Sequence, residues 1–121
     1  MLPGDDDDHE WWLNVEPETI RVALTLAQTA WWVDSEGTPH WVDSMTARHR
    51  RAVTAYLLPR ARDLLVAVQE TSLRARPDSA PHRAADQLLA NAPTLAGAER
   101  WLESTPLIRR LRQLNRSNQE Q

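Results

Sequence analysis

Apolar positions recur mostly at spacings of three and four along this chain, which is the period of an α-helix. Between residues 17 and 30, Ile20, Leu24 and Ala27 fall on one helical face. Pro17 suits a first helical turn, because its missing N–H would have no partner there. The pattern predicts a helix over residues 17–30.

A second apolar stripe begins at Met45 and continues to Leu73, with Asp43 or Ser44 expected to cap its first helix. Pro59 interrupts the stripe, and proline removes a backbone donor and crowds the preceding turn. We therefore expect either a kink at Pro59 or a new helix that begins there.

The C-terminal third contains three shorter helical patterns. Residues 74–81 hold two prolines and predict a linker, after which Ser79 can cap a short helix. Another helix is expected near Thr94. Thr105 followed by Pro106 is typical of a cap and a first turn, and predicts a last helix with leucines on one side.

The helical period breaks between residues 31 and 42. Trp31–Val33 and Trp41–Val42 are short extended segments, and residues 34–37 fit a type I turn that ends on glycine. Pro39 makes the second strand short or irregular. A two-stranded ribbon is only marginally stable alone, so we expect this hairpin to lean on the helices through its tryptophans.

These elements predict a mainly α fold, a small helical domain of about five helices with one short two-stranded β-hairpin. The length of 121 residues suits one domain. We expect a flexible acidic arm over residues 1–10, the helical domain over 11–115, and a frayed tail over 116–121. The four consecutive Asp of the arm predict no metal site, because consecutive residues rarely converge on one ion.

Charge is divided unevenly along the chain. Residues 1–44 contain ten acidic residues and one arginine, whereas residues 45–121 contain thirteen arginines and seven acidic residues. Such a division is typical of an acidic arm that shields a basic surface, or of self-association through complementary faces. A homo-oligomer is therefore one expectation.

Several classes of protein are disfavoured by what the sequence lacks. There is no cysteine, no apolar run long enough to span a membrane, and no secretion signal, so we expect a cytoplasmic protein. The sequence has no glycine-rich phosphate loop and no histidine spacing typical of a zinc hydrolase. We expect no cofactor and no metal.

His49 lies one helical turn after Met45 and is flanked by Arg48, Arg50 and Arg51. It could act as a general base near an anionic ligand held by these arginines. The alternative is a partly buried residue that hydrogen-bonds to the hairpin. We favour the second interpretation, because no carboxylate falls at a helical spacing from His49.

Arginine stripes mark two of the expected helices. With nearby aromatic rings they could bind nucleic acid or a nucleotide through phosphate pairing and base stacking. They could instead simply form the solvated face of each amphipathic helix. The candidate binding residues are Trp11, Trp12, Trp31, Arg48, His49, Arg51, Arg109 and Arg112.

The pattern between Trp32 and Leu57 resembles a recurring kind of small phage and prophage protein. The matching features are an aromatic residue, a glycine turn, a short extended segment, a Met-x-x-x-His helix start and an aliphatic stripe. They correspond to Trp32, Gly37, Trp41–Val42, Met45, His49, Val53 and Leu57, and residues 101–107 are similar to the end of the same proteins. The acidic arm departs from that pattern. The resemblance implies a source and a size class and names no activity.

Three functional hypotheses follow. The first is a non-enzymatic phage or mobile-element accessory protein that binds a host or phage macromolecule, with a protein as the expected partner. The second is a nucleic-acid or nucleotide-binding protein that uses arginine-rich helix faces and tryptophan stacking. The third is an enzyme centred on His49.

Overall fold

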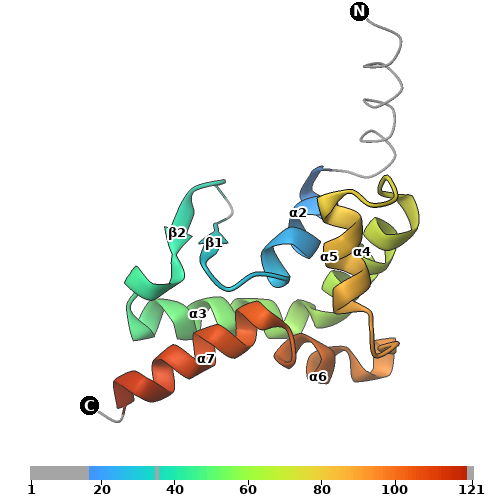
Figure 1. The fold of residues 1–121 in the computed structure, drawn as a ribbon. Coiled ribbons are helices and arrows are strands. Elements are labelled where there is room, and N and C mark those ends of the chain that lie inside the picture. Colours follow the sequence, from blue (N-terminus) through green and yellow to red (C-terminus); the bar gives the residue numbers. More distant parts are fainter. Residues whose placement is uncertain (1–16, 35, 120–121) are drawn as a thin grey trace, which may run out of the picture.

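Helices dominate residues 17–34 and 36–119, the part of the chain that the computed structural model describes (Figure 1). The predicted small helical domain with one two-stranded hairpin is confirmed. The predicted arm and the Trp11–Trp12 pair lie outside the described residues. The α-helices in chain order are α2 (Pro17–Leu26), α3 (Ala47–Leu57), α4 (Ala61–Arg74), α5 (Ala80–Leu88), α6 (Ala98–Glu103) and α7 (Pro106–Gln119).

The helix is interrupted at Pro59, where the sequence predicts either a kink or the start of a new helix. Helix α3 ends at Leu57, a short 3-10 turn η2 (Leu58–Arg60) follows, and α4 begins at Ala61. Counted as one bent rod, α3 and α4 leave five helical segments in the described chain, which agrees with the predicted number.

The hairpin joins β1 (Trp31–Val33) to β2 (Pro39–Trp41) as an antiparallel pair. Pro39 lies within the second strand, and Val42 already belongs to the 3-10 turn η1 (Val42–Ser44). The expected cap at Asp43 or Ser44 was wrong, because η1 takes up both residues. Thr46 is the cap instead, and its side-chain oxygen accepts from the backbone N–H of His49 at 3.0 Å.

Other predicted helix starts are confirmed. Ser79 caps α5 by accepting from the backbone N–H of His82, and Thr94 caps the 3-10 turn η3 (Leu95–Gly97). Helix α7 begins at Pro106 as predicted, and it continues to Gln119 beyond the expected domain end.

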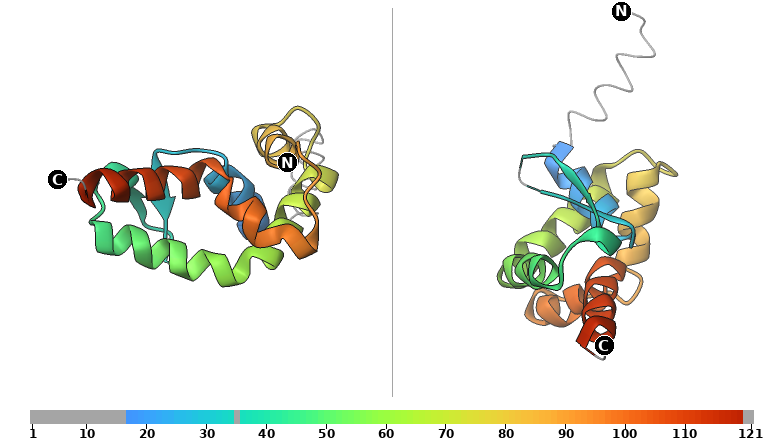
Figure 2. Two further views of the ribbon diagram at one scale, coloured as in Figure 1. Left: turned by 90° about the horizontal axis from the view of Figure 1, so that it is seen from below. Right: turned by 90° about the vertical axis from the view of Figure 1, so that its left-hand side faces the viewer.

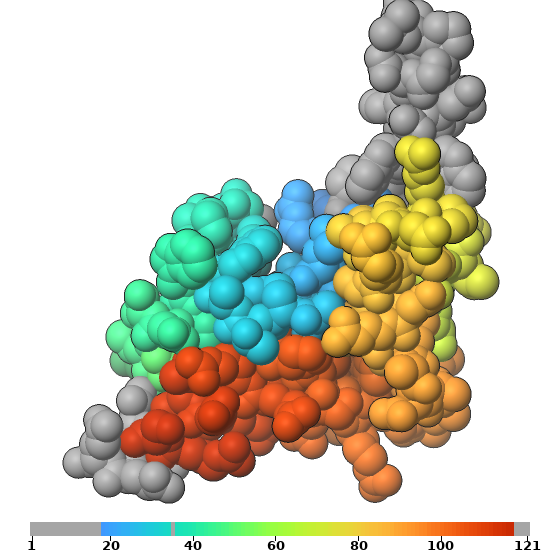
Figure 3. Space-filling view, viewed as in Figure 1, coloured from blue at the N-terminus to red at the C-terminus, as the bar shows by residue number. Residues whose placement is uncertain are grey.

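The elements form two lobes that share one core. The helical lobe consists of α2, α4 and α5 packed on one another, with α6 against α4. The hairpin lobe consists of β1, β2, η1, α3 and α7, with the hairpin above the two helices (Figures 1 and 2). Figure 3 shows the lobes side by side, with the hairpin at one end and α5 near the other. Fully buried side chains from both lobes meet in the core, including Val42, Leu65, Val68, Leu102, Ile108 and Leu111.

No helix among residues 17–34 and 36–119 has the length and apolar character needed to cross a lipid bilayer.

Candidate functional site

Helices α3 and α7 lie side by side and run in opposite directions (Figure 2). Near the end of α7, the Asn115 side-chain amide donates to the carbonyl of Ala47, at the start of α3, at 3.2 Å. Arg51 follows Ala47 by one turn, and Arg112 precedes Asn115 by about one turn. Antiparallel packing therefore places these two arginines at about the same level along the helix pair.

Four of the predicted arginines, Arg48, Arg51, Arg109 and Arg112, are exposed on this helix pair. We call them the basic face. The chain has no acidic residue over residues 44–62 or 104–119, so neither helix carries a carboxylate of its own in these stretches. The structure thus brings together arginines that are far apart in the sequence.

Carboxylates from neighbouring elements neutralise only part of this positive charge. In the described part of the chain, the arginines of α7 form two ion pairs, from Arg112 to Glu103 at 2.7 Å and from Arg110 to Asp43 at 3.3 Å. No ion pair is formed by Arg48, Arg51 or Arg109 within the same residues. The basic face can therefore accept an external anion without first breaking an internal pair at these three positions.

The bend at Pro59 limits how far the basic face extends along α3. Arg62, the next exposed arginine of the chain after Arg60, lies beyond η2 on α4. There it lines an open groove of about 710 Å³ together with Glu99 and Arg100. The carboxylate of Glu99 makes that groove a less favourable place for an anion than the α3–α7 pair.

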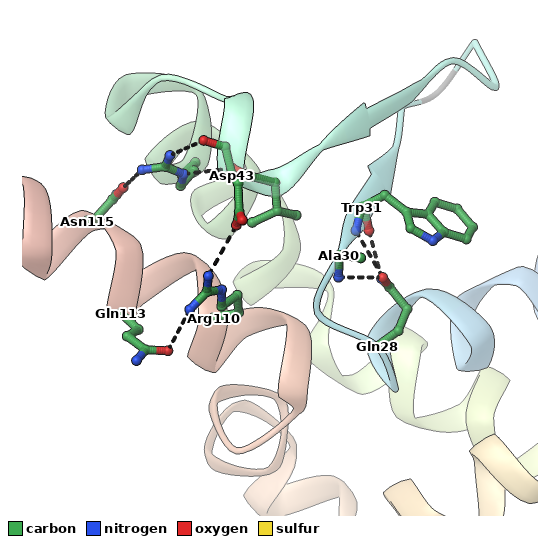
Figure 4. A network of polar contacts seen from close by, with 9 residues as sticks. Gln28, Ala30, Trp31, Asp43, Arg110, Gln113 and Asn115 are labelled. Atoms are coloured by element: carbon green, nitrogen blue, oxygen red, sulfur yellow. Dashed lines mark hydrogen bonds and ion pairs between the residues drawn. The ribbon is translucent and has the colours of Figure 1, made fainter.

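Arg50 has a role that the sequence analysis missed. Its side chain is 4% exposed, and it holds η1 and α7 against α3. The guanidinium donates to the carbonyls of Val42 and Asp43 at 3.0 and 3.3 Å and to the side-chain oxygen of Asn115 at 3.1 Å (Figure 4). A planar group with five donors suits three acceptors from separate elements. No sequence signal distinguishes Arg50 from its neighbours Arg48 and Arg51.

His49 is half-buried against the hairpin, which agrees in position with the favoured interpretation. Its ring meets the ring of His40 edge to face, with 5.3 Å between the ring centroids. The Nε2 atom of His40 lies 2.9 Å from a carboxylate oxygen of Asp34. His49 thus touches a histidine on β2 that is itself partnered by a carboxylate, a neighbour that helical spacing along α3 could not reveal.

The side-chain hydrogen bond with His40 is the largest effect on Asp34 and lowers the pKa of its carboxyl group. Backbone N–H groups of Thr38 and Glu36 lower the pKa further, because they also favour the charged carboxylate. Asp34 therefore anchors both the turn of the hairpin and the inward-facing His40. We interpret Asp34, His40 and His49 as a polar contact between the hairpin and α3.

The tryptophans divide into two sets across the hairpin. Trp32 packs on the core, whereas Trp31, a candidate binding residue of the sequence analysis, is half-buried. Trp41 is the exposed ring, with 67% of its surface accessible, and the sequence analysis did not select it. Neighbouring side chains of a strand point to opposite faces. If His40 is placed toward α3, Trp41 must therefore point away from α3 and toward solvent.

Within the described ranges, no three histidine or acidic side chains gather closely enough to hold a metal ion.

No family model matches the chain, and neither a curated protein nor a solved structure matches it.

Proposed function

We propose that this chain is a non-enzymatic accessory protein of a phage or mobile element that acts by binding a macromolecule. We further propose that the macromolecule is a nucleic acid, engaged by the basic face. The resemblance of the segment from Trp32 to Leu57 to small phage and prophage proteins supports the source.

The observation that carries the nucleic-acid proposal is the distribution of charge over α3 and α7. Residues 44–62 and 104–119 hold nine of the fourteen arginines and no acidic residue, and the two segments contain the packed helices α3 and α7. The chain as a whole has a net charge of −3, yet residues 17–119 contain fourteen arginines and ten acidic residues, a net of +4. Exposed arginines pair well with phosphate, and a polyanion releases counterions when they bind.

A salt titration with a fluorescein-labelled oligonucleotide tests this proposal. The binding constant should fall steeply as salt rises, because each phosphate contact adds about 0.9 to the slope of log K against log salt. The double variant Arg48→Gln/Arg51→Gln should bind several-fold to roughly a hundredfold more weakly at 0.1 M salt and show a shallower slope.

The matched control is Arg83→Gln/Arg100→Gln, which removes the same charge from exposed arginines of α5 and α6. It should bind almost as the unmodified protein does. Equal weakening in both double variants would mean that net charge alone governs binding. Absence of binding at low salt would refute a nucleic-acid partner.

A protein partner is the second candidate, and exposed apolar side chains on α4 favour it. Leu73 has 83% of its surface accessible and Val66 has 40%, and their spacing of seven residues places them on one helical face. Light scattering over a range of protein concentrations would detect self-association through this face. Leu73→Gln should lower the mass of any oligomer, and an unchanged mass would exclude α4 as the contact.

A further inference from the structure

The hairpin has an inner and an outer face that differ sharply in what they contact. The register pairs Trp32 with His40 and Trp31 with Trp41. The first pair points inward, because Trp32 packs on the core and the His40 ring meets His49 of α3. Directly paired residues of an antiparallel ribbon share one face, so Trp31 and Trp41 point outward together.

The outer hairpin face consists of Trp31, Val33, Pro39 and Trp41. Alternation along each strand gives all four residues the same outward direction. Trp41 and Pro39 are exposed and the other two are half-buried. An apolar surface that carries two tryptophans at paired strand positions is therefore available to a partner on the side of the hairpin away from α3.

Both ends of this surface are held in place. The side-chain amide of Gln28 binds the backbone of Trp31 twice, accepting from its N–H at 2.9 Å and donating to its carbonyl at 2.7 Å (Figure 4). Next to Trp41, the N–H of Val42 donates to the carbonyl of Ala30, and Arg50 donates to the carbonyl of Val42. Because the backbone that carries both tryptophans is held, only their side chains need ordering when a flat ligand stacks on them, which lowers the cost of binding.

One arginine of α7, Arg110, reaches the segment that follows the outer hairpin face. Asp43 follows Trp41 by two residues, and its carboxylate lies 3.3 Å from the guanidinium of Arg110. The Arg110 guanidinium therefore lies close to the chain that follows Trp41. Two carboxylates of this region have partners of their own, Asp43 with Arg110 and Asp34 with His40, which reduces their repulsion of an anionic ligand.

We propose that the outer hairpin face is a stacking site for unpaired nucleobases, so that the protein prefers single-stranded to duplex nucleic acid. This inference rests on the proposed function. Phosphates pair with the arginines of α3 and α7, while one or two bases stack on Trp41 and Trp31. Aromatic side chains stack on any base whose ring face is free, whereas the bases of a duplex already cover one another's faces.

The test compares two labelled probes, a twelve-nucleotide thymidine strand and a twelve-base-pair duplex, with the full-length protein. The unmodified protein should bind the single strand more tightly. Trp41→Ala should weaken binding to the single strand by about tenfold and leave duplex binding within about twofold, because a stacked base contributes roughly 1–3 kcal/mol. Trp41→Tyr, which keeps a ring, should restore most of the loss.

Leu73→Ala is the matched control, because it removes an even more exposed apolar side chain from α4, outside the hairpin. It should leave both affinities unchanged. Equal affinity of the unmodified protein for both probes, or unchanged single-strand binding by Trp41→Ala, would overturn the stacking site while leaving the basic face in place. Absence of binding to either probe at low salt would overturn both proposals.

Discussion

The helical lobe and the hairpin lobe differ in how their buried polar contacts are arranged. In the helical lobe, the buried Thr71 hydroxyl on α4 lies within hydrogen-bonding distance of two carbonyls, that of Ala67 one turn earlier at 2.9 Å and that of Thr19 on α2 at 3.3 Å. In the hairpin lobe, the buried Arg50 joins η1, α3 and α7, whose contacting residues are up to 65 positions apart. Both lobes therefore combine apolar burial with polar contacts between elements, and the hairpin lobe differs because several of its contacts depend on one side chain, Arg50.

This difference matters for function because both proposed surfaces belong to the hairpin lobe. Arg50 and Asn115 hold α7 beside α3, which brings the basic face together, and Gln28 holds the strand that carries Trp31. A single polar substitution can therefore disturb a binding surface here without removing any apolar contact of the core. Four substitution experiments would test the contrast between the lobes.

The largest effect is expected from Leu65→Ala in the helical lobe. Leu65 is fully buried on α4, and truncation of such a side chain costs about 2–5 kcal/mol of unfolding free energy, since it loses transfer energy and leaves a cavity. Denaturant unfolding followed by circular dichroism measures this loss. The exposed Leu73→Ala on the same helix should change stability by less than about 0.5 kcal/mol. Similar losses in both variants would contradict the assigned core.

Arg50→Met should have the next largest effect and should act locally. It leaves the carbonyl of Val42 and the side chain of Asn115 without their donor, at a cost of about 1–3 kcal/mol. Hydrogen exchange should accelerate over η1 and the last turns of α7 more than over α5 and α6. Uniform acceleration across both lobes would show that the hairpin lobe has no separate dependence on this residue.

A smaller effect is expected when the four Asp of residues 5–8 are changed to Asn. If the acidic arm shields the basic face, this variant should bind the labelled oligonucleotide roughly severalfold more tightly at low salt, and the gain should fade as the Debye length shortens. The control removes the same charge elsewhere, in Asp63→Asn, Glu70→Gln, Asp78→Asn and Glu99→Gln. An equal gain in the control would assign the effect to net charge instead of the arm.

The smallest effect concerns the pH dependence of the hairpin. The pKa of Asp34 is lowered from its ordinary value of 3.8, mainly by the hydrogen bond with His40. A carboxyl group with a depressed pKa in the folded protein contributes stability that is present above pH 3.8 and is lost as pH falls through the folded pKa. Denaturant midpoints of the protein and of Asp34→Asn should therefore differ at pH 6 and converge toward pH 3. A constant difference at both pH values would contradict this contribution.

Much of the fold follows from the sequence, and the successful predictions share a local cause. The capping of α5 by Ser79, the first turn at Pro106 and the break at Pro59 each depend on a few adjacent residues. The cap of α3 was misplaced because η1, which Arg50 secures from α3, takes up the residues that would otherwise cap the helix. A local pattern cannot anticipate a turn that depends on a donor in the next element.

The candidate sites were less predictable for the same reason. Arg48, Arg50 and Arg51 look alike in the sequence, yet one is buried and two are exposed. Trp31 and Trp41 likewise differ in exposure because α2 lies next to β1 and not because their neighbours in the sequence differ.

The sequence by itself determined the helices, the hairpin and the uneven charge, because side-chain periodicity, proline and capping act over a few residues. Only the tertiary structure decided which side chains share a surface. Antiparallel packing of α3 on α7 brings together arginines more than fifty positions apart, and the strand register directs Trp31 and Trp41 outward together. Both outcomes depend on contacts between distant segments, which are selected by burial of the common core.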